Sequence, residues 1–221
     1  TAMTTKTHIR IDVPVPFPGG GHVYEPDQDT FLLVGALEQQ AWQGRWELGA
    51  QGQQQGLPPP LVCLEIGCGS GYVTTFASKL FAEVGTYCLG TDINPRATRC
   101  TLETAALNQA PCVDSVQTIF AEGVAERLQG QVDVLLFNPP YVPSSAEEVP
   151  APTCGEHIDA AWAGGPRGRQ VVDAFLPQVP ALLSRPHGCF FLLAMRENDP
   201  ADIVRQLAPH GLQGSVVARR Q

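Results

Sequence analysis

Residues 61–94, LVCLEIGCGSGYVTTFASKLFAEVGTYCLGTDIN, decide the fold. The stretch predicts an apolar strand, then a helix with apolar residues at helical spacing, then a second apolar strand. These predicted elements cover residues 61–68, 71–81 and 86–93. A glycine-rich turn joins the first strand to the helix. Two strands joined through a helix form the β-α-β unit of a parallel sheet, so the stretch indicates an α/β fold.

The rest of the chain continues this alternation. Helices are predicted over residues 29–42, 95–109, 124–129, 168–183 and 200–210, and strands over 115–121, 132–138, 188–195 and 211–220. The strands are continuous apolar runs, which is typical of strands buried on both faces of a sheet. We therefore expect a doubly wound α/β fold with a mostly parallel sheet.

Length and composition predict a single domain. The chain has 221 residues, of which 43% are hydrophobic, and one domain of roughly 100–200 residues is the usual size. Residues 1–24 are rich in proline and glycine and are expected to be extended, and residues 25–221 are expected to form the domain. A Gln-, Gly- and Pro-rich stretch at about 43–60 is expected to be a flexible insertion.

Charge and cysteine content narrow the function classes. Lysine and arginine total 14 against 22 aspartates and glutamates, a net charge of −8, which argues against salt-driven binding to nucleic acid or to anionic membranes. No run approaches the ~18 apolar residues of a membrane helix. The seven cysteines are an odd number without a C-x-x-C pair, which indicates reduced thiols rather than disulfides or a zinc site. We expect no metal site, a cytoplasmic location, and the nucleus as an additional one.

The glycine-rich turn is a candidate cofactor site. Glu65 stands two residues before Gly67, and Gly69 and Gly71 follow. Such a turn lets backbone N–H groups and a helix N-terminus face an anion, but the spacing alone also fits an ordinary strand-to-helix turn. Asp92 ends the next predicted strand, where a carboxylate can bind both hydroxyls of an adenosine ribose. A solvated turn residue is the alternative for Asp92.

A second candidate site is Asn138-Pro139-Pro140-Tyr141, at the end of the strand predicted over 132–138. The asparagine side-chain oxygen and the Pro139 carbonyl can accept the two N–H bonds of a planar –NH2 group and aim its nitrogen lone pair at an electrophilic carbon. The Tyr141 ring can stack on the planar group or face a sulfonium cation. The alternative is structural, because Pro-Pro ends strands and Asn before Pro favours turns.

Together, these motifs resemble class I S-adenosylmethionine-dependent methyltransferases that modify planar nitrogens. The segments VYEPDQDTFLL, TDINPRATRCTLETAALN, FNPPYVP and AAWAGGPRGRQVVDAFLPQVPALLS are similar to the eukaryotic and archaeal HemK-type release-factor glutamine methyltransferases. The resemblance extends from about Val23 to Gln221, interrupted by the insertion. It implies a Rossmann-like sheet of the seven-stranded type.

The resemblance also implies roles for individual residues. The implied cofactor-binding residues are Thr30, Glu65, Gly67, Gly69, Gly71, Asp92, Ile93 and Asn138, and the implied catalytic residues are Asn138, Pro139 and Tyr141. Thr30 would close over S-adenosylmethionine, although a helix N-terminal hydroxyl is the alternative. Residues 161–165 would wall the target pocket. Family members carry an aspartate after the third strand that holds the adenine amine, and here Ala121 or Glu122 falls at that place.

The predicted last strand, 211–220, is a further departure from the family pattern. The family sheet ends with a sixth strand and an antiparallel seventh strand that lies between strands five and six. Residues 211–220 can form the sixth, and no seventh follows. The expectation is a sheet whose last strand is missing from this chain.

The resemblance implies N5-methylation of the glutamine in a Gly-Gly-Gln motif of a translation termination factor. Histone lysine methylation is an alternative, although an ammonium must first lose a proton and the motif offers no evident base. N6-adenine methylation of DNA or RNA is a weaker alternative, because the chain has only Lys6 and Lys79 and scattered arginines. A non-catalytic binding protein is the alternative from another class, and the intact motif at 138–141 argues against it.

The resemblance implies two protein partners: the release factor as substrate and a small zinc-binding activator subunit. The activator extends the sheet of such enzymes along an edge strand, here the strand predicted over 115–121, which is apolar for an exposed edge. We therefore expect the isolated chain to be poorly soluble. The loop 143–157 contains Glu147 and Glu148, which could meet basic residues of a substrate or belong to an ordinary solvated loop.

Overall fold

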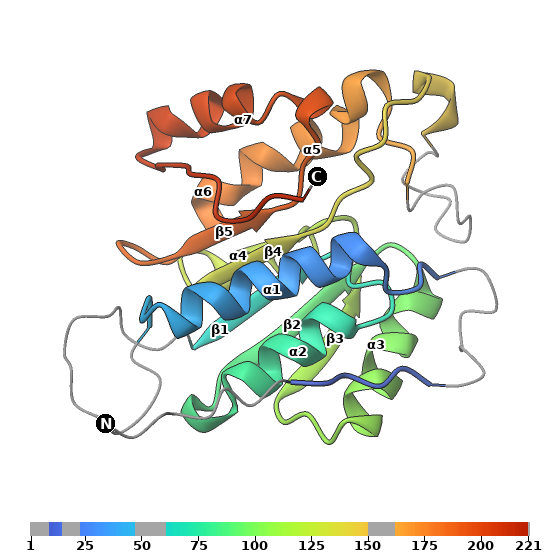
Figure 1. Cartoon of the computed structure of the whole chain (residues 1–221), viewed down its shortest axis with the longest axis vertical. Helices are drawn as coiled ribbons and strands as arrows, with labels where there is room; N and C mark the ends of the chain where they lie inside the picture. Colours follow the sequence, from blue (N-terminus) through green and yellow to red (C-terminus); the bar gives the residue numbers. More distant parts are fainter. Residues whose placement is uncertain (1–8, 15–22, 47–60, 150–161, 221) are drawn as a thin grey trace.

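Five parallel strands form one sheet in the order β3-β2-β1-β4-β5 (Figure 1). The structure is a computed structural model that describes residues 9–14, 23–46, 61–149 and 162–220. The strands are β1 (Val62–Ile66), β2 (Tyr87–Asp92), β3 (Val113–Gln117), β4 (Val134–Phe137) and β5 (Cys189–Leu192). Most of the 43–60 insertion and most of the 1–24 segment lie outside the described residues.

Helices alternate with the strands along the chain. The α-helices are α1 (Gln28–Trp42), α2 (Tyr72–Leu80), α3 (Pro95–Leu107), α4 (Ala125–Leu128), α5 (Gln170–Phe175), α6 (Val179–Leu182) and α7 (Pro200–Leu207). Short 3₁₀ turns are η1 (Ala82–Val84), η2 (Ala146–Glu148), η4 (Pro166–Gly168), η5 (Leu176–Gln178), η6 (Arg196–Asn198) and η7 (Ala208–His210). The α/β alternation predicted from the sequence is confirmed. No helix in the described ranges has the length and apolar character needed to cross a bilayer.

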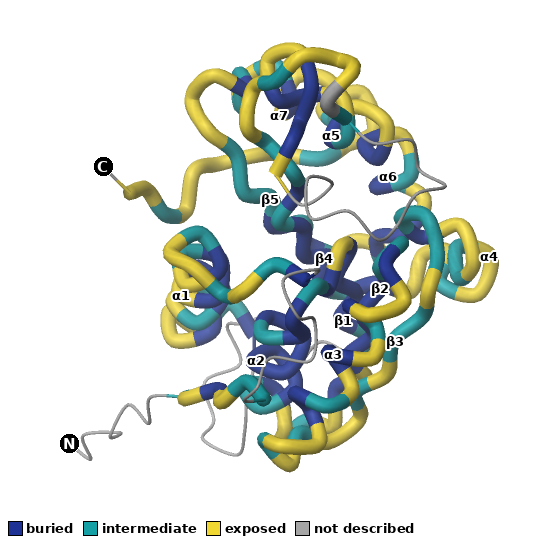
Figure 2. The backbone as a smooth tube through the Cα atoms, turned by 90° about the vertical axis from the view of Figure 1, so that its right-hand side faces the viewer, coloured by how far each residue is buried: buried dark blue, intermediate teal, exposed yellow. Residues whose placement is uncertain are grey.

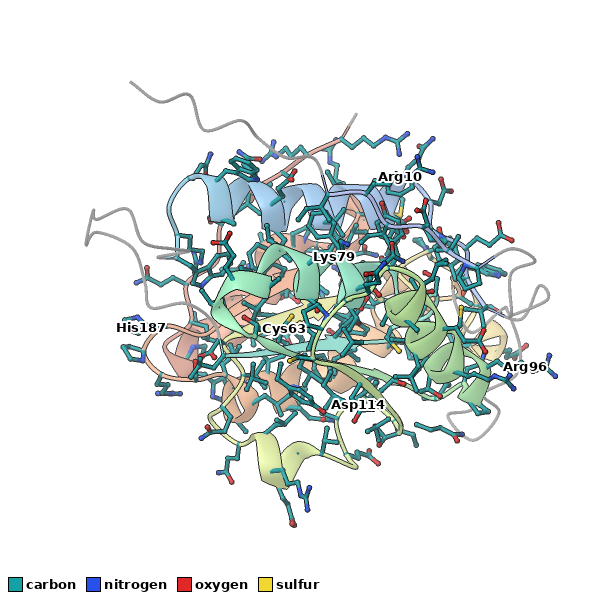
Figure 3. The ribbon with its side chains drawn as sticks, turned by 90° about the horizontal axis from the view of Figure 1, so that it is seen from below. Arg10, Cys63, Lys79, Arg96, Asp114 and His187 are labelled. Atoms are coloured by element: carbon teal, nitrogen blue, oxygen red, sulfur yellow. The ribbon has the colours of Figure 1, made fainter. Side chains whose placement is uncertain are left out.

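The sheet is covered on both faces, which explains its continuous apolar strands. Helices α1 and α2 pack on one face with alternate residues of β1, β2, β4 and β5, among them Cys63 and Leu136. Helices α5 and α6 pack on the other face, where Leu64 and Leu135 meet Phe175. Figure 2 shows the buried strands between these two helical layers, and Figure 3 shows Cys63 between them. The doubly wound fold is therefore confirmed, with five strands in the part of the chain that the structure describes.

The third strand begins and ends earlier than the predicted 115–121. It pairs with β2 from Val113 opposite Cys88 to Gln117 opposite Asp92, and the ladder stops where β2 stops. The apolar residues that follow, 119–121, suggested a longer strand but turn inward instead. The edge strand itself is VDSVQ, so the prediction of an apolar edge was wrong, although β3 does form an edge of the sheet.

The predicted strand over 211–220 does not form. After η7 this segment makes no ladder with β5, and it runs toward the side of the sheet on which α1 lies (dark red in Figure 1; Figure 2). It packs beside α7, where a Cβ added to Gly214 would lie 2.4 Å from Val204 Cγ2. A strand needs a neighbour that pairs its backbone groups, and among the described residues none lies next to this segment.

Candidate active site

A cavity of about 370 Å³ lies at the carboxyl ends of β1, β2 and β4. This is the edge at which open α/β sheets bind ligands. The predicted site residues that line the cavity are Thr30, Glu65, Gly67, Gly69, Asp92, Ile93, Asn138, Pro139 and Tyr141. Three predicted residues, Gly71, Ala121 and Glu122, do not line it.

Glu65 is a buried carboxyl group on the cavity wall. It is the fourth residue of β1, and its side chain is 3% exposed. The Thr74 hydroxyl of α2 donates a hydrogen bond to it. Burial raises the pKa of Glu65 from 4.5 to about 8, although the Thr74 bond opposes this shift. A ligand cation at this wall would favour the ionised form of Glu65.

Asp92 sits at the end of β2 and is tied to the glycine-rich turn. Its Oδ2 accepts the Gly69 N–H at 3.0 Å and its Oδ1 accepts the Asn94 N–H at 2.9 Å. Burial raises the pKa of Asp92, and these backbone N–H groups oppose that shift. The Ile93 backbone N–H also bonds to this carboxylate, so one of its about four acceptor positions remains for a hydroxyl in the cavity.

Gly71 has a packing role in the structure. It precedes α2 with a φ of +77°, and a Cβ at this position would lie 2.4 Å from Thr101 Cα of α3. A side chain would push the turn away from α3. The sequence identified Gly71 as part of the cofactor loop, but its contact is with α3 rather than with the cavity.

The cavity wall after β3 also differs from the prediction. Thr118, Ile119 and Phe120 line the cavity at this place, whereas Ala121 is fully buried and Glu122 is exposed. The predicted strand was displaced toward the C-terminus, so the residues assigned to the position after it were displaced as well. The described wall here carries one hydroxyl and two apolar side chains and no carboxylate, which suits contact with a flat aromatic ring.

Asn138 follows β4 directly and presents an unpaired acceptor. Its Oδ1 is buried and has no hydrogen-bond partner among the described residues, while its Nδ2 donates to Asp29 Oδ2 at 3.4 Å. A buried polar atom without a partner costs free energy unless a ligand or water satisfies it. Because Asn138 lines the cavity, the arrangement fits a ligand that brings an N–H donor to this atom.

Asp29, in the first turn of α1, is a site residue that the sequence analysis missed. Its carboxylate also accepts the Tyr141 hydroxyl at 2.8 Å, the Tyr24 hydroxyl at 3.2 Å and the Thr30 N–H at 2.9 Å. The segment VYEPDQDTFLL carries part of the family resemblance, but the resemblance implies a role only for Thr30. Thr30 lines the cavity, as expected of a cofactor-binding residue. It is also a hydroxyl at the helix N-terminus, because its Oγ1 accepts the Asp27 N–H in a capping box.

The outer part of the cavity is walled by the segment after residue 161. Val142 forms an isolated bridge with Ala163, and Trp162 lines the cavity while 41% exposed. Gly164 lies so close to Pro140 that a Cβ would come within 2.7 Å of the Pro140 carbonyl oxygen. Ala161 and most of the loop after residue 149 lie outside the described residues. Within the described ranges, no three His, Cys, Asp or Glu side chains gather as a metal site.

The geometry combines two subsites in one cavity. Glu65, Asp92 and the wall at 118–120 can hold a nucleoside with a cationic group, and the corner at 138–141 can hold a planar –NH2 group by its N–H bonds. Since both subsites line the same cavity, the arrangement suits transfer of a group from a bound nucleoside to a nitrogen.

Comparison with known proteins identifies relatives of the chain. Residues 55–153 match the family described as "Methyltransferase small domain". "Methyltransferase HEMK2" of Mus musculus is 43% identical over 215 residues, which cover 94% of this chain and 91% of that protein. The "eRF1 methyltransferase catalytic subunit mtq2" of Schizosaccharomyces pombe is 36% identical over 196 residues, covering 86% of this chain and 79% of that protein.

Among solved structures, the fold is similar to the ribosomal protein L11 methylase of Lactobacillus delbrueckii subsp. bulgaricus. The TM-score is 0.52 with 20% identity, covering 86% of this chain and 72% of that chain. At this identity the likeness concerns the fold alone, and it agrees with the Rossmann-like sheet of methyltransferases.

Proposed function

Because the chain belongs to the HemK-type methyltransferase family, we propose that it methylates N5 of a glutamine in a Gly-Gly-Gln motif of a peptide release factor. The family membership rests on relatives that match nearly the whole chain. The fission yeast relative is named as an eRF1 methyltransferase, which supports a release factor as the substrate. The single observation that carries the choice of an amide is the buried Asn138 Oδ1, which has no partner among the described residues and belongs to a residue that lines the cavity.

The family and fold imply S-adenosylmethionine as the cofactor, and the described residues fit it. Asp92 lines the cavity and keeps an acceptor position for a ribose hydroxyl, and Glu65 is a buried carboxyl suited to a cationic amino acid portion. Gly67 and Gly69 line the cavity without side chains. When bound, the cofactor supplies an electrophilic methyl group on a sulfonium.

The residues at 138–141 would orient the target amide. Asn138 Oδ1 and the Pro139 carbonyl would each accept one N–H bond of the –NH2 group, which fixes the plane of the amide and the direction of its lone pair. Proline stiffens this corner, so the two acceptors keep their separation. Positioning of this kind lowers the barrier to in-line transfer without a strong base.

The surroundings of Asp29 favour an amide over a lysine ammonium. A lysine must give up a proton before it attacks, and Asp29 is the carboxylate in contact with Asn138 and Tyr141. A carboxylate has about four acceptor positions. Asp29 uses all four for the bonds from Tyr24, Thr30, Asn138 and Tyr141, so it is engaged in holding the site together.

Labelled methyl transfer to a Gly-Gly-Gln release factor tests this function. We expect the factor to gain one methyl group and its Gln→Asn variant to gain none. Asn138→Ala should lower kcat by roughly 100-fold, as expected when one transition-state hydrogen bond is lost, with little change in cofactor affinity. Equal labelling of the Gln→Asn variant would contradict the proposal. Labelling of a histone lysine peptide instead would support the lysine alternative.

We also propose an activator subunit that binds the edge strand β3. The fission yeast relative is named as a catalytic subunit, which supports a complex for that protein. On this chain, Leu102 is 43% exposed and lies one turn after Thr98, whose carbonyl accepts the Ser115 hydroxyl of β3 at 2.8 Å. An apolar side chain next to a strand edge suits a partner that adds a strand.

For its location we propose the cytoplasm, with the nucleus as a second compartment. The six described cysteines are free thiols. Five of these six are buried, among them Cys63 and Cys88 in adjacent strands, a placement typical of core thiols that pack as small apolar side chains.

A further inference from the structure

We propose that Asp29 is a positioning residue that fixes the orientation of the Asn138 amide, so that its oxygen and not its nitrogen faces the target –NH2 group. This inference deepens the proposed function and rests on it. The observation is the contact of Asp29 Oδ2 with Asn138 Nδ2 at 3.4 Å, next to the unpaired Asn138 Oδ1.

The chemistry of the two groups fixes the orientation. An asparagine side chain has a donor end and an acceptor end of nearly equal size, so shape alone does not decide which end faces the cavity. An ionised carboxylate only accepts hydrogen bonds. Whatever lies against Asp29 must therefore be the –NH2 end of Asn138, which leaves the buried, unpaired oxygen as the end that is free to accept from the target.

Three further donors hold the Asp29 carboxylate in place. The Thr30 N–H and the Tyr24 hydroxyl bond to Oδ1, and the Tyr141 hydroxyl bonds to Oδ2 together with Asn138. Burial, followed by the contact with Asp29, raises the pKa of both tyrosines, so both remain protonated donors at neutral pH. The carboxylate thus fixes both Asn138 and Tyr141 at the target slot.

Replacing Asp29 by asparagine should reverse the orientation of Asn138. The Thr30 N–H is a fixed backbone donor, so the new side chain must turn its oxygen toward Thr30 and its –NH2 toward Asn138. Asn138 then satisfies that –NH2 with its own oxygen and turns its nitrogen into the cavity. A donor would face the –NH2 of the target, and the clamp would lose one acceptor.

The positioning role of Asp29 predicts an order of activities that a purely structural role does not. Asp29→Asn keeps the shape and should lower kcat by roughly 100-fold, comparable to the loss of one transition-state hydrogen bond. Asp29→Ala leaves Asn138 able to adopt both orientations and should lower kcat by only about 10-fold. If Asp29 only stabilised the fold, Asp29→Ala would lose more activity than Asp29→Asn, because alanine is smaller and makes no hydrogen bonds.

The test measures kcat and KM on the Gly-Gly-Gln release factor, with the activator subunit present, and the cofactor Kd and Tm of each variant. We expect KM and Kd within about threefold of wild type for both variants, and a Tm for Asp29→Asn at least as high as for Asp29→Ala. Glu103→Gln is the matched carboxylate-to-amide control, because the Glu103 side chain bonds to Arg99 of the same helix, α3, and lies outside the cavity lining. It should leave kcat unchanged.

A second measurement does not depend on activity: the rate at which the Asn138 side-chain –NH2 protons exchange with water. NMR on asparagine-labelled protein measures this rate, and the signal missing in Asn138→Asp identifies Asn138. One proton is held by Asp29 in the wild type, and both face the cavity in Asp29→Asn, so exchange should be faster in the variant. Equal exchange, or an alanine variant less active than the asparagine variant, would overturn the inference. Wild-type protein that fails to methylate glutamine would instead overturn the proposed function, while the exchange measurement still decides the orientation.

Discussion

Asn198 donates its side-chain Nδ2 to the main-chain carbonyl of Tyr141 over 2.8 Å, across 57 positions of sequence. The same nitrogen contacts the carbonyls of Arg167 at 2.9 Å and Gly168 at 3.4 Å, and Oδ1 accepts the Met195 N–H at 2.6 Å. Asn198 is 1% exposed. One buried side chain therefore fixes the end of the 138–141 corner to the turn that follows the outer wall of the cavity.

Asn198→Ala should disturb both the fold and the target pocket. It leaves buried carbonyls without a donor, and we expect the free energy of unfolding to fall by about 2–3 kcal/mol. Because Tyr141 loses its backbone anchor, KM for the release factor should rise and kcat should fall, while the cofactor Kd changes little.

Asn108→Ala is the matched control for Asn198→Ala. The Asn108 side chain likewise donates to main-chain carbonyls, here those of Asp12 at 2.6 Å and Thr104 at 2.8 Å, but at the far end of α3. Denaturation and steady-state kinetics of both variants check the prediction. A loss of stability without any kinetic effect in Asn198→Ala would show that this residue does not position the pocket.

Glu65→Gln should stabilise the protein without cofactor. The pKa of Glu65 is about 8 in the fold against 4.5 ordinarily, so between these values the folded state binds more protons than the unfolded state. Stability is therefore lost as pH rises from 4.5 to 8. Glutamine removes this dependence on pH. At pH 8 the free energy of unfolding of Glu65→Gln should exceed that of the wild type by on the order of a few kcal/mol. Thermal scans at several pH values would show this as a higher Tm. If Tm depended on pH in the same way in Glu65→Gln as in the wild type, the raised pKa of Glu65 would be contradicted.

Cofactor binding by the wild type should release a proton. A bound cation favours ionised Glu65, so below pH 8 the carboxyl must lose its proton when S-adenosylmethionine binds, and affinity should rise with pH up to about 8. Calorimetry in two buffers of different ionisation enthalpy measures the released proton. Glu65→Gln should bind more weakly and release none. Affinity that does not change between pH 6 and 8 would count against this role of Glu65.

Gly71→Ala should destabilise the protein much more than Gly85→Ala. Both positions have a positive φ, +77° and +72°, which costs about 1–2 kcal/mol for alanine. A Cβ at Gly71 would also lie 2.4 Å from Thr101 Cα, whereas nothing lies within 4 Å at Gly85. We expect a total loss of about 3 kcal/mol or more at Gly71, measured by denaturant unfolding. Equal losses at the two positions would mean that the close approach to α3 carries no cost.

Gln117→Pro should block the activator without breaking the sheet. Thr118 donates its N–H to Asp92, and Cys112 accepts from Cys88, so the even-numbered residues of this strand bond to β2 and Gln117 turns its N–H to the outer edge. Proline removes only that donor. Gln117→Ala is the control, because both variants lose the side-chain bond to the Ile93 carbonyl. In a pull-down, the activator should bind Gln117→Ala but should not bind Gln117→Pro. Equal binding of both variants would rule out pairing at this edge.

The sequence predicted the helices and most strands well, because their burial pattern is local. Helix α1 was predicted over 29–42 and runs over Gln28–Trp42, with an acidic N-cap and apolar residues at helical spacing. The prediction failed where pairing decides the outcome. Strand β3 ends opposite Asp92 because β2 ends there, and the apolar residues after it belong to the cavity wall, which local pattern does not distinguish from a strand.

The doubly wound fold, the glycine-rich turn and the 138–141 corner could be predicted without a structure, because each depends on residues adjacent in the chain. The contact of Asp29 with Asn138 and that of Asn198 with Tyr141 could not be predicted in this way. These contacts join segments separated by 109 and 57 positions, and a hydrogen bond forms only when its two atoms come within a few ångströms of each other. Chain folding brings such groups together, so their partnership is a property of the packed sheet and its helices.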